Sequence, residues 1–329
     1  MKDVSIILVT HKRLGHLSKL LEQVVEQFPS SEVIVVINGD ASSQYDDLRK
    51  KYSFIWLEGS FETPGLARNY GLSKSQRKWL LFLDDDITLP DDFSKKAVSI
   101  LERTTDKIVA LGGPDQQPPN SNFFSRALSL ALTSPMATAH TRLRHTKTMG
   151  SIRSGDESNL ILCNLWVKKN FIVDNKILFN KNLFRNEENL LIEEILQAGG
   201  EAEYHPELSI YHYRKTRLDS LLKAVFSSGK HRIKSIIFNR KLFNFLFLIP
   251  SIWVLYILSL FFYSTVPYYL IPLKLYLSLS LFISFKICAK EALLWPLVLF
   301  YQIFLNIFYG LGVIYGLLCW PFWIFSLRK

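Results

Sequence analysis

The sequence predicts an α/β domain with a mostly parallel sheet, followed by C-terminal transmembrane helices. Short runs of β-branched and apolar residues alternate with helical patterns up to residue 112. Residues 242–329, by contrast, contain only six charged side chains: Lys274, Lys286, Lys290, Glu291, Arg328 and Lys329. Because the two parts suit different solvents, the sequence argues against a purely soluble protein, an intrinsically disordered chain and a disulfide-stapled secreted fold.

Four apolar runs in the N-terminal part have the length and composition of buried strands: residues 4–9, 32–37, 53–57 and 79–83. Helical patterns lie between them, at residues 17–25 and 65–74. Strands that alternate with helices form right-handed βαβ units, which predicts a mostly parallel sheet.

Polar groups directly follow two of these strands. Asn38-Gly39 is a turn signal after the second strand, and Asp84-Asp85-Asp86 follows the fourth. Because ligands of such sheets bind at the carboxyl ends of the strands, we expect a site there. Three neighbouring carboxylates are costly unless a cation neutralises them, and Mg²⁺ or Mn²⁺ prefers such oxygen ligands. The alternative is a solvated turn or a helix cap.

The pattern loosens after residue 112. Glycine and proline predict a loop at residues 112–120, and residues 133–157, which have little periodicity, predict a mobile flap. Residues 190–198 predict a helix preceded by Glu187-Glu188. That acidic pair either carries chemistry or only places favourable charge at the helix N-terminus.

The cysteines argue against structural zinc. Cys163, Cys288 and Cys319 are odd in number and far apart, without a CxxC motif or a Cys/His cluster, so a reducing compartment is expected. The N-terminal segment is too short and too soon interrupted for a signal peptide. We therefore expect the first domain to stay on the side of the membrane where it is made.

Residues 214–241 predict basic amphipathic helices. They contain nine lysines and arginines and one acid, and five apolar residues share one helical face: Leu218, Leu221, Leu222, Val225 and Phe226. Beside membrane spans, such a segment favours the bilayer surface. The alternative is an ordinary surface helix of the soluble domain.

Spans are predicted at residues 243–263 and 269–287, although Lys274 must then snorkel outward. Lysine and arginine flank this pair but are absent from its loop, so the first domain should be cytoplasmic. Residues 292–327 predict either one crossing with an interfacial segment broken at Pro321 or a tight hairpin near Gly310. Gly312 and Gly316 form a GxxxG pattern, which allows helices to approach closely.

Five motifs in order make most of residues 3–232 resemble the family 2 glycosyltransferases, which have a Rossmann-like GT-A fold. They are Thr10-His11-Lys12-Arg13 after the first strand, Pro64–Gly71, Asp84-Asp85-Asp86 at the place of an Asp-x-Asp motif, Glu187-Glu188 ahead of Gly199-Gly200, and Tyr204–Arg214. Tyr309–Gly312 with Gly316 resembles the tail of membrane-anchored exopolysaccharide glucosyltransferases of the succinoglycan type.

The resemblance implies a Mn²⁺ or Mg²⁺ ion held by Asp86, Asp84 and His212, which neutralises a departing nucleoside diphosphate. It implies substrate contacts from Thr10, His11, Arg13, Asn38, Asp40, Gly65, Arg68, Asn69, Asp84 and Asp85. The alternatives are a surface salt bridge for Arg68 and a packed side chain for His212. Ile37 stands where the family usually has an acidic residue, and Asp40 is a candidate substitute.

By resemblance, Glu188 is the general base that takes the proton of the acceptor hydroxyl, and Glu187 is its nearest rival. The family more often has aspartate at the position of Glu188. A one-step displacement with the base on the far face inverts the anomeric centre.

The implied protein transfers a sugar from a nucleotide sugar, expected to be a UDP-sugar, to a polyprenyl-diphosphate-linked or other lipid-linked acceptor. Residues 1–213 form its catalytic domain, residues 214–241 its interfacial helices, and residues 242–329 its transmembrane region in the cell (inner) membrane. One rival is a processive polysaccharide synthase, which the missing Gln-x-x-Arg-Trp signature disfavours. Another is a catalytically inactive nucleotide-binding scaffold. Nucleic-acid binding is disfavoured because the basic cluster abuts the spans and lacks an RNA-binding or helix-turn-helix motif.

Overall fold

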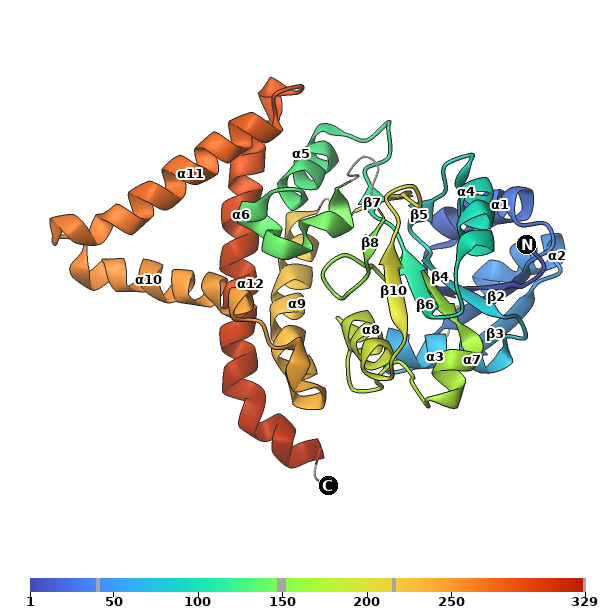
Figure 1. Cartoon of the computed structure of the whole chain (residues 1–329). Coiled ribbons are helices and arrows are strands. Elements are labelled where there is room, and N and C mark those ends of the chain that lie inside the picture. Colours follow the sequence, from blue (N-terminus) through green and yellow to red (C-terminus); the bar gives the residue numbers. More distant parts are fainter. Residues whose placement is uncertain (40–41, 147–151, 215–216, 328–329) are drawn as a thin grey trace. The chain divides into compact units, whose positions relative to one another are not determined.

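The computed structural model describes residues 1–39, 42–146, 152–214 and 217–327 (Figure 1). The chain divides into two units. The first comprises Met1–Pro118 and Leu143–Tyr213, and the second comprises Pro119–Arg142 and Arg214–Lys329. An excursion of the chain, residues 119–142, therefore belongs to the same unit as the C-terminal helices.

The first unit contains an eight-stranded sheet in the order β3-β2-β1-β4-β9-β6-β10-β8. Its strands are β1 (Val4–Thr10), β2 (Glu32–Asn38), β3 (Ile55–Gly59), β4 (Trp79–Asp84), β6 (Ile108–Gly112), β8 (Arg153–Ser154), β9 (Asn164–Lys168) and β10 (Glu201–Tyr204). Only β9 and β8 run antiparallel to their neighbours. The mostly parallel α/β sheet expected from the sequence is thus confirmed.

Helices cover both faces of this sheet (Figure 1). One face packs against α1 (Leu14–Gln27) and α4 (Phe93–Arg103), and the other against α3 (Pro64–Lys74), α7 (Lys169–Asp174) and α8 (Glu187–Gln197). A short helix, α2 (Asp46–Lys51), follows the 3₁₀ turn η1 (Ser42–Tyr45). Because strand side chains alternate, Ile6 and Leu8 enter the α1 side of the core while Ile7 enters the α3 side.

A second, small sheet lies beyond the carboxyl end of β4. It has the order β5-β11-β7, with β5 (Ile87–Thr88), β7 (Asp115–Gln116) and β11 (Ile210–His212). In register, His212 pairs with Ile87 and Ile210 pairs with Asp115. The ladder therefore draws the Asp84–Asp86 turn, the predicted 112–120 loop and the His212 strand together.

The expectation of an unpacked flap at residues 133–157 is wrong for its first half. Residues 135–138 form α6 (Pro135–Thr138), which continues into the 3₁₀ helix η2 (Ala139–His145). Ser134 is buried, and its Oγ accepts a hydrogen bond from the Met136 backbone amide at 3.1 Å. A capping serine followed by proline starts a helix without the periodicity that longer helices show. Residues 147–151 of this segment lie outside the described residues.

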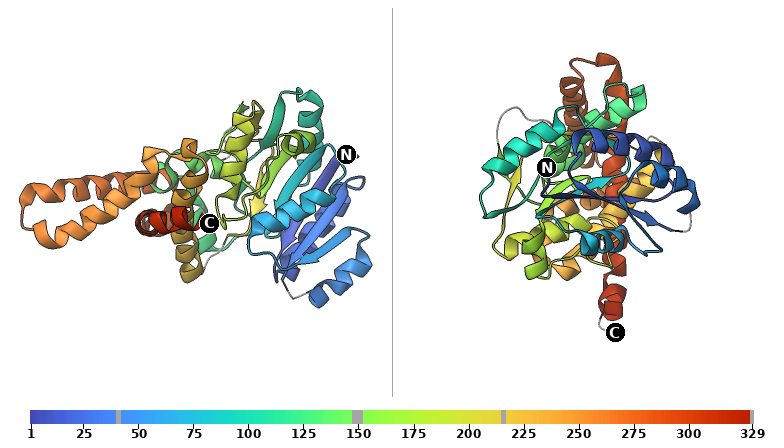
Figure 2. Two further views of the ribbon diagram at one scale, coloured as in Figure 1. Left: turned by 90° about the horizontal axis from the view of Figure 1, so that it is seen from below. Right: turned by 90° about the vertical axis from the view of Figure 1, so that its right-hand side faces the viewer.

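The second unit is helical. Its main helices are α5 (Phe123–Leu132), α9 (Leu218–Phe238), α10 (Ile249–Tyr263), α11 (Ile271–Ile287) and α12 (Trp295–Leu327). Figure 2 shows α10 and α11 as two arms joined by the turn η5 (Pro267–Leu270). Among the described residues, three segments are long and apolar enough to cross a membrane: 245–263, 267–287 and 292–326.

Both predictions for residues 292–327, a break at Pro321 and a hairpin near Gly310, are wrong, because α12 is one continuous helix. It runs for 33 residues through Gly310 and Pro321 without a break, about 50 Å at 1.5 Å per residue. Gly310 serves helix packing instead of a hairpin turn, because an added Cβ would lie 2.4 Å from the Pro250 carbonyl oxygen. Pro321 is accommodated within the helix, as proline often is in apolar helices.

The backbones of α9 and α12 are in direct contact. A Cβ at Gly312 would lie 2.1 Å from the Phe226 carbonyl oxygen, and one at Gly229 would lie 2.3 Å from the Tyr309 carbonyl oxygen. Glycine therefore stands on each helix where the other crosses, as the GxxxG pattern predicts for α12.

The excursion is fixed to α12 in two ways. Apolar side chains of α5, including Ala127 and Leu128, pack in one cluster with residues of α12. On the next segment, Ser134 Oγ accepts a hydrogen bond from Gln302 Nε2 at 2.9 Å, and the Met136 carbonyl oxygen accepts one from Asn306 Nδ2 at 2.5 Å. Gln302 is fully buried, so this polar contact is sealed from solvent.

Replacing Gly312 with leucine should lower the stability of the second unit by about 1–3 kcal/mol, because the side chain would overlap the α9 backbone. Helix propensity alone favours leucine by about 1 kcal/mol, so a net loss would show that packing dominates. The apparent melting temperature in detergent measures the effect. Leu311→Ala, at an exposed neighbouring position, is the control; equal melting of Gly312→Leu and wild type would contradict the close contact.

Candidate functional site

The candidate site lies at the carboxyl ends of β1, β2 and β4. These strands end at Thr10, Asn38 and Asp84. Helix α3 contributes Arg68, α8 contributes Glu187 and Glu188, and β11 contributes His212. The carboxylates of this edge are mostly buried, and each has a cationic or hydroxyl partner.

Asp85 anchors the loop after β1 to the site. Its Oδ2 accepts a hydrogen bond from Thr10 Oγ1 at 2.8 Å, and its Oδ1 lies 2.9 Å from Arg13 Nη1. Thr10 Oγ1 also contacts the Tyr45 hydroxyl at 3.2 Å. Burial raises the pKa of Asp85 even though Arg13 opposes it. Asp85 thus holds Thr10 and Arg13 in place beside the neighbouring carboxylates.

Asp86 faces His212. Its Oδ1 lies 3.3 Å from His212 Nε2, and its Oδ2 pairs with Arg13. Burial alone would raise the pKa of Asp86, but His212 and Arg13 outweigh it and hold that pKa below its ordinary value. Burial would likewise lower the pKa of His212, yet its hydrogen bonds to Asp115 and Asp86 raise it well above its ordinary value.

Arg68 joins the two acidic motifs. Its Nη2 lies 2.9 Å from Asp84 Oδ1, and its Nη1 lies 3.0 Å from Glu187 Oε1. Only 6% of Arg68 is exposed, so the alternative of a surface salt bridge is wrong. Burial disfavours its charge, but Asp84 and Glu187 together keep the pKa of Arg68 above its ordinary value.

Glu187 and Glu188 form the first turn of α8, and both are buried. Burial, with Glu188 adding to it and Arg68 opposing it, raises the pKa of Glu187 to about 7. Glu188 Oε1 lies 3.2 Å from Arg144 Nη1. Arg144 Nη2 also donates to Asn189 Oδ1 at 2.5 Å and to the Glu157 carbonyl oxygen. Charge at a helix N-terminus alone does not require such burial, so the pair is suited to chemistry.

Two asparagine side chains that were expected to contact substrate are hydrogen-bonded to backbone groups instead. Asn38 accepts a hydrogen bond from the Phe61 amide at 2.8 Å and donates to its carbonyl oxygen at 3.3 Å. Asn69 makes the same two-way contact with Phe179, at 3.0 and 2.8 Å. These asparagines hold the segments around the site.

The remaining expected contacts surround these amides. His11 Nδ1 donates to the Asn38 carbonyl oxygen at 2.6 Å. A Cβ at Gly65 would lie 3.0 Å from Phe179 Cβ, so the start of α3 comes close to that segment. Asp40 lies outside the described residues.

The structure adds Asp115 and Arg144, which the sequence did not single out. Asp115 is fully buried and lies 2.8 Å from His212 Nδ1 and 2.5 Å from His145 Nδ1. It follows the carboxyl end of β6 by three residues, so the rule applied to Asp84 would have found it. Arg144 lies in the segment without periodicity, and no comparable sequence signal marks it.

Cys163 and His212 are far apart in the sequence, but the fold brings them close together. Ligand atoms of Asp115, Cys163 and His212 lie within 4.8 Å of one another. Burial raises the pKa of the Cys163 thiol to about 12, although His212 opposes this. A sulfur ligand also does not suit Mg²⁺ or Mn²⁺, which prefer oxygen ligands.

Asp84, Asp86 and His212 fit a divalent cation better. Carboxylate oxygens are the donors that Mg²⁺ and Mn²⁺ prefer, and one imidazole nitrogen is compatible with Mn²⁺. The side chains of Asp84, Asp86 and His212 are partly exposed, at 31%, 14% and 21%, so none of the three is sealed from solvent. Of the three ligands that the resemblance implied, Asp86 and His212 face each other, with Oδ1 and Nε2 3.3 Å apart.

Comparison with known proteins finds similar sequences for the N-terminal half of the chain. Residues 5–158 match the family model of glycosyl transferase family 2. A curated relative, an uncharacterized glycosyltransferase of Haemophilus influenzae, is 29% identical over 124 residues. That match spans 37% of this chain and 37% of the relative, well under two thirds of the relative's length.

Solved structures share the fold. The mannosyltransferase PcManGT of Pyrobaculum calidifontis, in complex with GDP-Man and Mn²⁺, is 13% identical, with a TM-score of 0.57 over 96% of this chain and 87% of that one. TarS residues 1–349 of S. aureus, in complex with UDP-GlcNAc, is 14% identical, with a TM-score of 0.51 over 96% and 92%. The expectation of a GT-A fold is confirmed.

The raised pKa of Glu187 predicts a pH dependence of stability. The folded chain holds this proton up to about pH 7, whereas the unfolded chain releases it near 4.5, so the associated stability is present below pH 4.5 and lost as the pH rises through 7. Glu187→Gln has no such proton, so its stability does not fall over this pH range in the same way. The free energy of unfolding of the variant, relative to that of wild type, should therefore rise by on the order of 3 kcal/mol between pH 5 and pH 8.

Unfolding measured in the presence of EDTA at both pH values tests this expectation. Glu201→Gln, which removes an exposed carboxylate of β10, is the control and should show little change. A difference between Glu187→Gln and wild type that does not vary with pH, or that varies in the opposite direction, would contradict it.

Proposed function

We propose, from the premise that residues 5–158 form a glycosyl transferase family 2 domain, that the protein is an inverting glycosyltransferase. It moves a sugar from a nucleotide sugar, a UDP-sugar in our proposal, to a lipid-linked saccharide acceptor in polysaccharide biosynthesis. The observation that carries this proposal is the single buried cluster in which Arg68 links Asp84 to Glu187. The Arg68 guanidinium thus contacts both Asp84, which is assigned to the side of the leaving diphosphate, and Glu187, which belongs to the pair assigned to the acceptor proton.

Donor binding is assigned to the Asp84–Asp86 side of the cluster. Asp86, Asp84 and His212 would hold Mn²⁺ or Mg²⁺, which supplies positive charge against the departing diphosphate. The imidazole favours Mn²⁺, and the PcManGT complex contains Mn²⁺ beside its nucleotide sugar. Arg13 and Arg68 add fixed cations beside the diphosphate.

The remaining donor contacts are assigned to the loops around this side of the site. They are Thr10, His11, Asn38, Asp40, Gly65, Asn69 and Asp85. Thr10 and Asp85 are held to each other, and His11 to Asn38, so these loops are preorganised before the nucleotide binds.

Proton transfer is assigned to the acidic pair on α8. An acceptor hydroxyl becomes a competent nucleophile as a carboxylate takes its proton during bond formation. Glu188 is the proposed base, and Arg144 holds its carboxylate. Glu187 remains the rival, because its pKa of about 7 suits a base that works near neutral pH. Attack from the face opposite the diphosphate inverts the anomeric centre.

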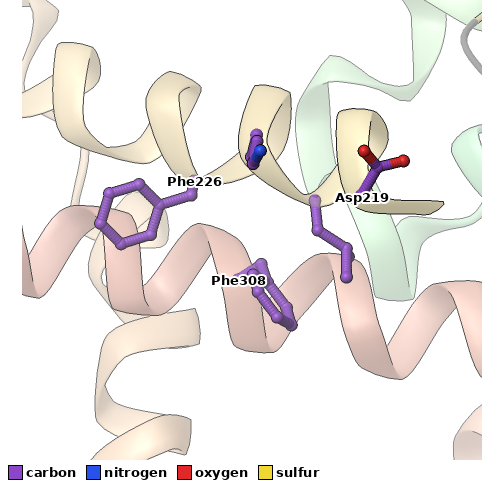
Figure 3. A pocket seen from close by; sticks show the side chains of 5 residues that line it. Asp219, Phe226 and Phe308 are labelled. Carbon is purple, nitrogen blue, oxygen red and sulfur yellow. The ribbon is translucent and has the colours of Figure 1, made fainter. Parts of the chain in front are cut away.

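The acceptor is proposed to be lipid-linked, such as a polyprenyl diphosphate carrying a saccharide. In the second unit, α9 and α12 border a hollow of about 360 Å³ lined by Asp219, Leu222, Lys223, Phe226 and Phe308 (Figure 3). Its apolar side chains suit hydrocarbon, and the Lys223 ammonium suits a phosphate. The charge distribution around α10 and α11 supports a cytoplasmic catalytic domain at the inner membrane.

Asp86→Asn should abolish metal-dependent binding of the nucleotide sugar, because it removes the charge that faces both His212 and Arg13. Calorimetric titration of a panel of nucleotide sugars, with and without Mn²⁺, measures this and identifies the donor. Asp91→Asn removes an exposed carboxylate nearby and should bind like wild type. Unchanged Mn²⁺-dependent affinity in Asp86→Asn would refute the site.

Glu188→Gln should bind the donor normally but lower transfer by about 100-fold or more, the usual contribution of a general base. Transfer is assayed with lipid-linked and lipid-free acceptors in parallel, and the lipid-linked form should be preferred. If Glu187→Gln alone loses transfer, the base is Glu187. If both variants and wild type bind donor without any turnover, the chain is a nucleotide-binding scaffold.

A further inference from the structure

The two ring nitrogens of His212 face different carboxylates. Nδ1 lies 2.8 Å from Asp115 Oδ2, and Nε2 lies 3.3 Å from Asp86 Oδ1. The imidazole therefore bridges a fully buried acid and a more exposed one. Only the Asp86 side belongs to the metal cluster proposed above.

Asp115 is held from several directions. Its other oxygen, Oδ1, lies 2.5 Å from His145 Nδ1 at the end of η2. Its backbone pairs with Ile210 on β11, the strand that ends at His212. The position of the carboxylate relative to the His212 ring is thus fixed by a strand ladder as well as by side-chain contacts.

These contacts determine which nitrogen is available to a metal. An ionised carboxylate only accepts hydrogen bonds, so the Nδ1 that contacts Asp115 carries a proton. Nε2 also faces a carboxylate, that of Asp86. A cation bound by Asp86 would take the place of the proton on Nε2, so the lone pair of Nε2 is the one available to a metal. Histidine ligands of metals usually donate their second N–H to such a carboxylate, which fixes both ring orientation and tautomer.

We propose that Asp115 is a positioning residue of the metal centre: it holds His212 with Nε2 directed at the ion, and His145 in turn holds Asp115. This inference rests on the proposed metal ligands Asp86, Asp84 and His212. Asp115 itself is not among the proposed ligands; its oxygens face His145 and His212.

A separate metal site formed by Asp115, Cys163 and His212 is the competing interpretation of the same cluster. It would require Asp115 to give up its contacts with His145 and His212, since both of its oxygens already face imidazole nitrogens. It would also direct His212 away from Asp86. The observed hydrogen bonds favour the positioning role.

The test measures Mn²⁺ affinity of the full-length protein in detergent. Electron paramagnetic resonance counts free Mn²⁺ in titrations with the metal alone and with UDP or GDP. Asp115→Asn should weaken Mn²⁺ binding by about 10–100-fold, the usual cost of losing such a partner. His212→Ala should lose at least as much, and the double variant should equal His212→Ala. Asp106→Asn, a fully exposed carboxylate, is the matched control and should bind like wild type.

Three results would overturn the inference. Wild-type Mn²⁺ affinity in Asp115→Asn, when His212→Ala has lost it, would remove the positioning role. Additive losses in the double variant would mean that Asp115 acts independently of His212, as a direct ligand would. Unchanged affinity in His212→Ala would instead refute the ligand assignment of the proposed function, and the inference would fall with it.

A measurement on the unmutated protein covers the case in which Asp115→Asn does not fold. With ¹⁵N-labelled histidine, Mg²⁺ and UDP or GDP, the ¹⁵N shifts of His212 report which nitrogen carries the proton. Its signals are assigned by their loss in His212→Ala. We expect a protonated Nδ1 and an unprotonated Nε2, and the reverse tautomer would overturn the positioning role.

Discussion

The buried guanidinium of Arg68 is the constraint on which the site depends. It lies between Asp84, at the end of a central strand, and Glu187, at the start of α8, two groups separated by about a hundred residues of chain. Removing one partner from a buried ion pair typically costs about 3–5 kcal/mol, because the other charge remains uncompensated. Arg68 therefore couples the acidic motifs of β4 and α8 through two ion pairs, and the surrounding fold has to keep the three side chains at these distances.

The same principle repeats around the cluster. Arg13, at the start of α1, balances Asp85 and Asp86, while Arg144, at the end of η2, balances Glu188. The arginine that pairs with each acidic side chain comes from another part of the chain than the acid itself, so no single helix or strand creates the site. Packing of α1, α3 and α8 against the central sheet is what brings these charges together.

Local sequence patterns predicted the strands and the acidic residues at the edge of the sheet. Both signals, an apolar run and the polar residues that follow it, are contained in a few consecutive residues. Asp84–Asp86 was found in this way, and Glu187-Glu188 as an acidic pair directly before a predicted helix. Asp115 and Arg144 were missed because their roles depend on tertiary partners, His212 and Glu188. The helix through Gly310 was mispredicted for a similar reason, since glycine marks a turn or a close helix contact according to what lies opposite.

The excursion at residues 119–142 has a consequence for how the protein has to be handled. Ser134 and Met136, at the start of α6, are hydrogen-bonded to Gln302 and Asn306 of an apolar helix. Arg144, the partner of Glu188, lies two residues beyond the end of the excursion. Arg144, which contacts the proposed catalytic base, is therefore joined by a short stretch of chain to a segment that is hydrogen-bonded to α12. A detergent that disturbs the packing of α12 would then also disturb the contact between Arg144 and Glu188 through this short connection.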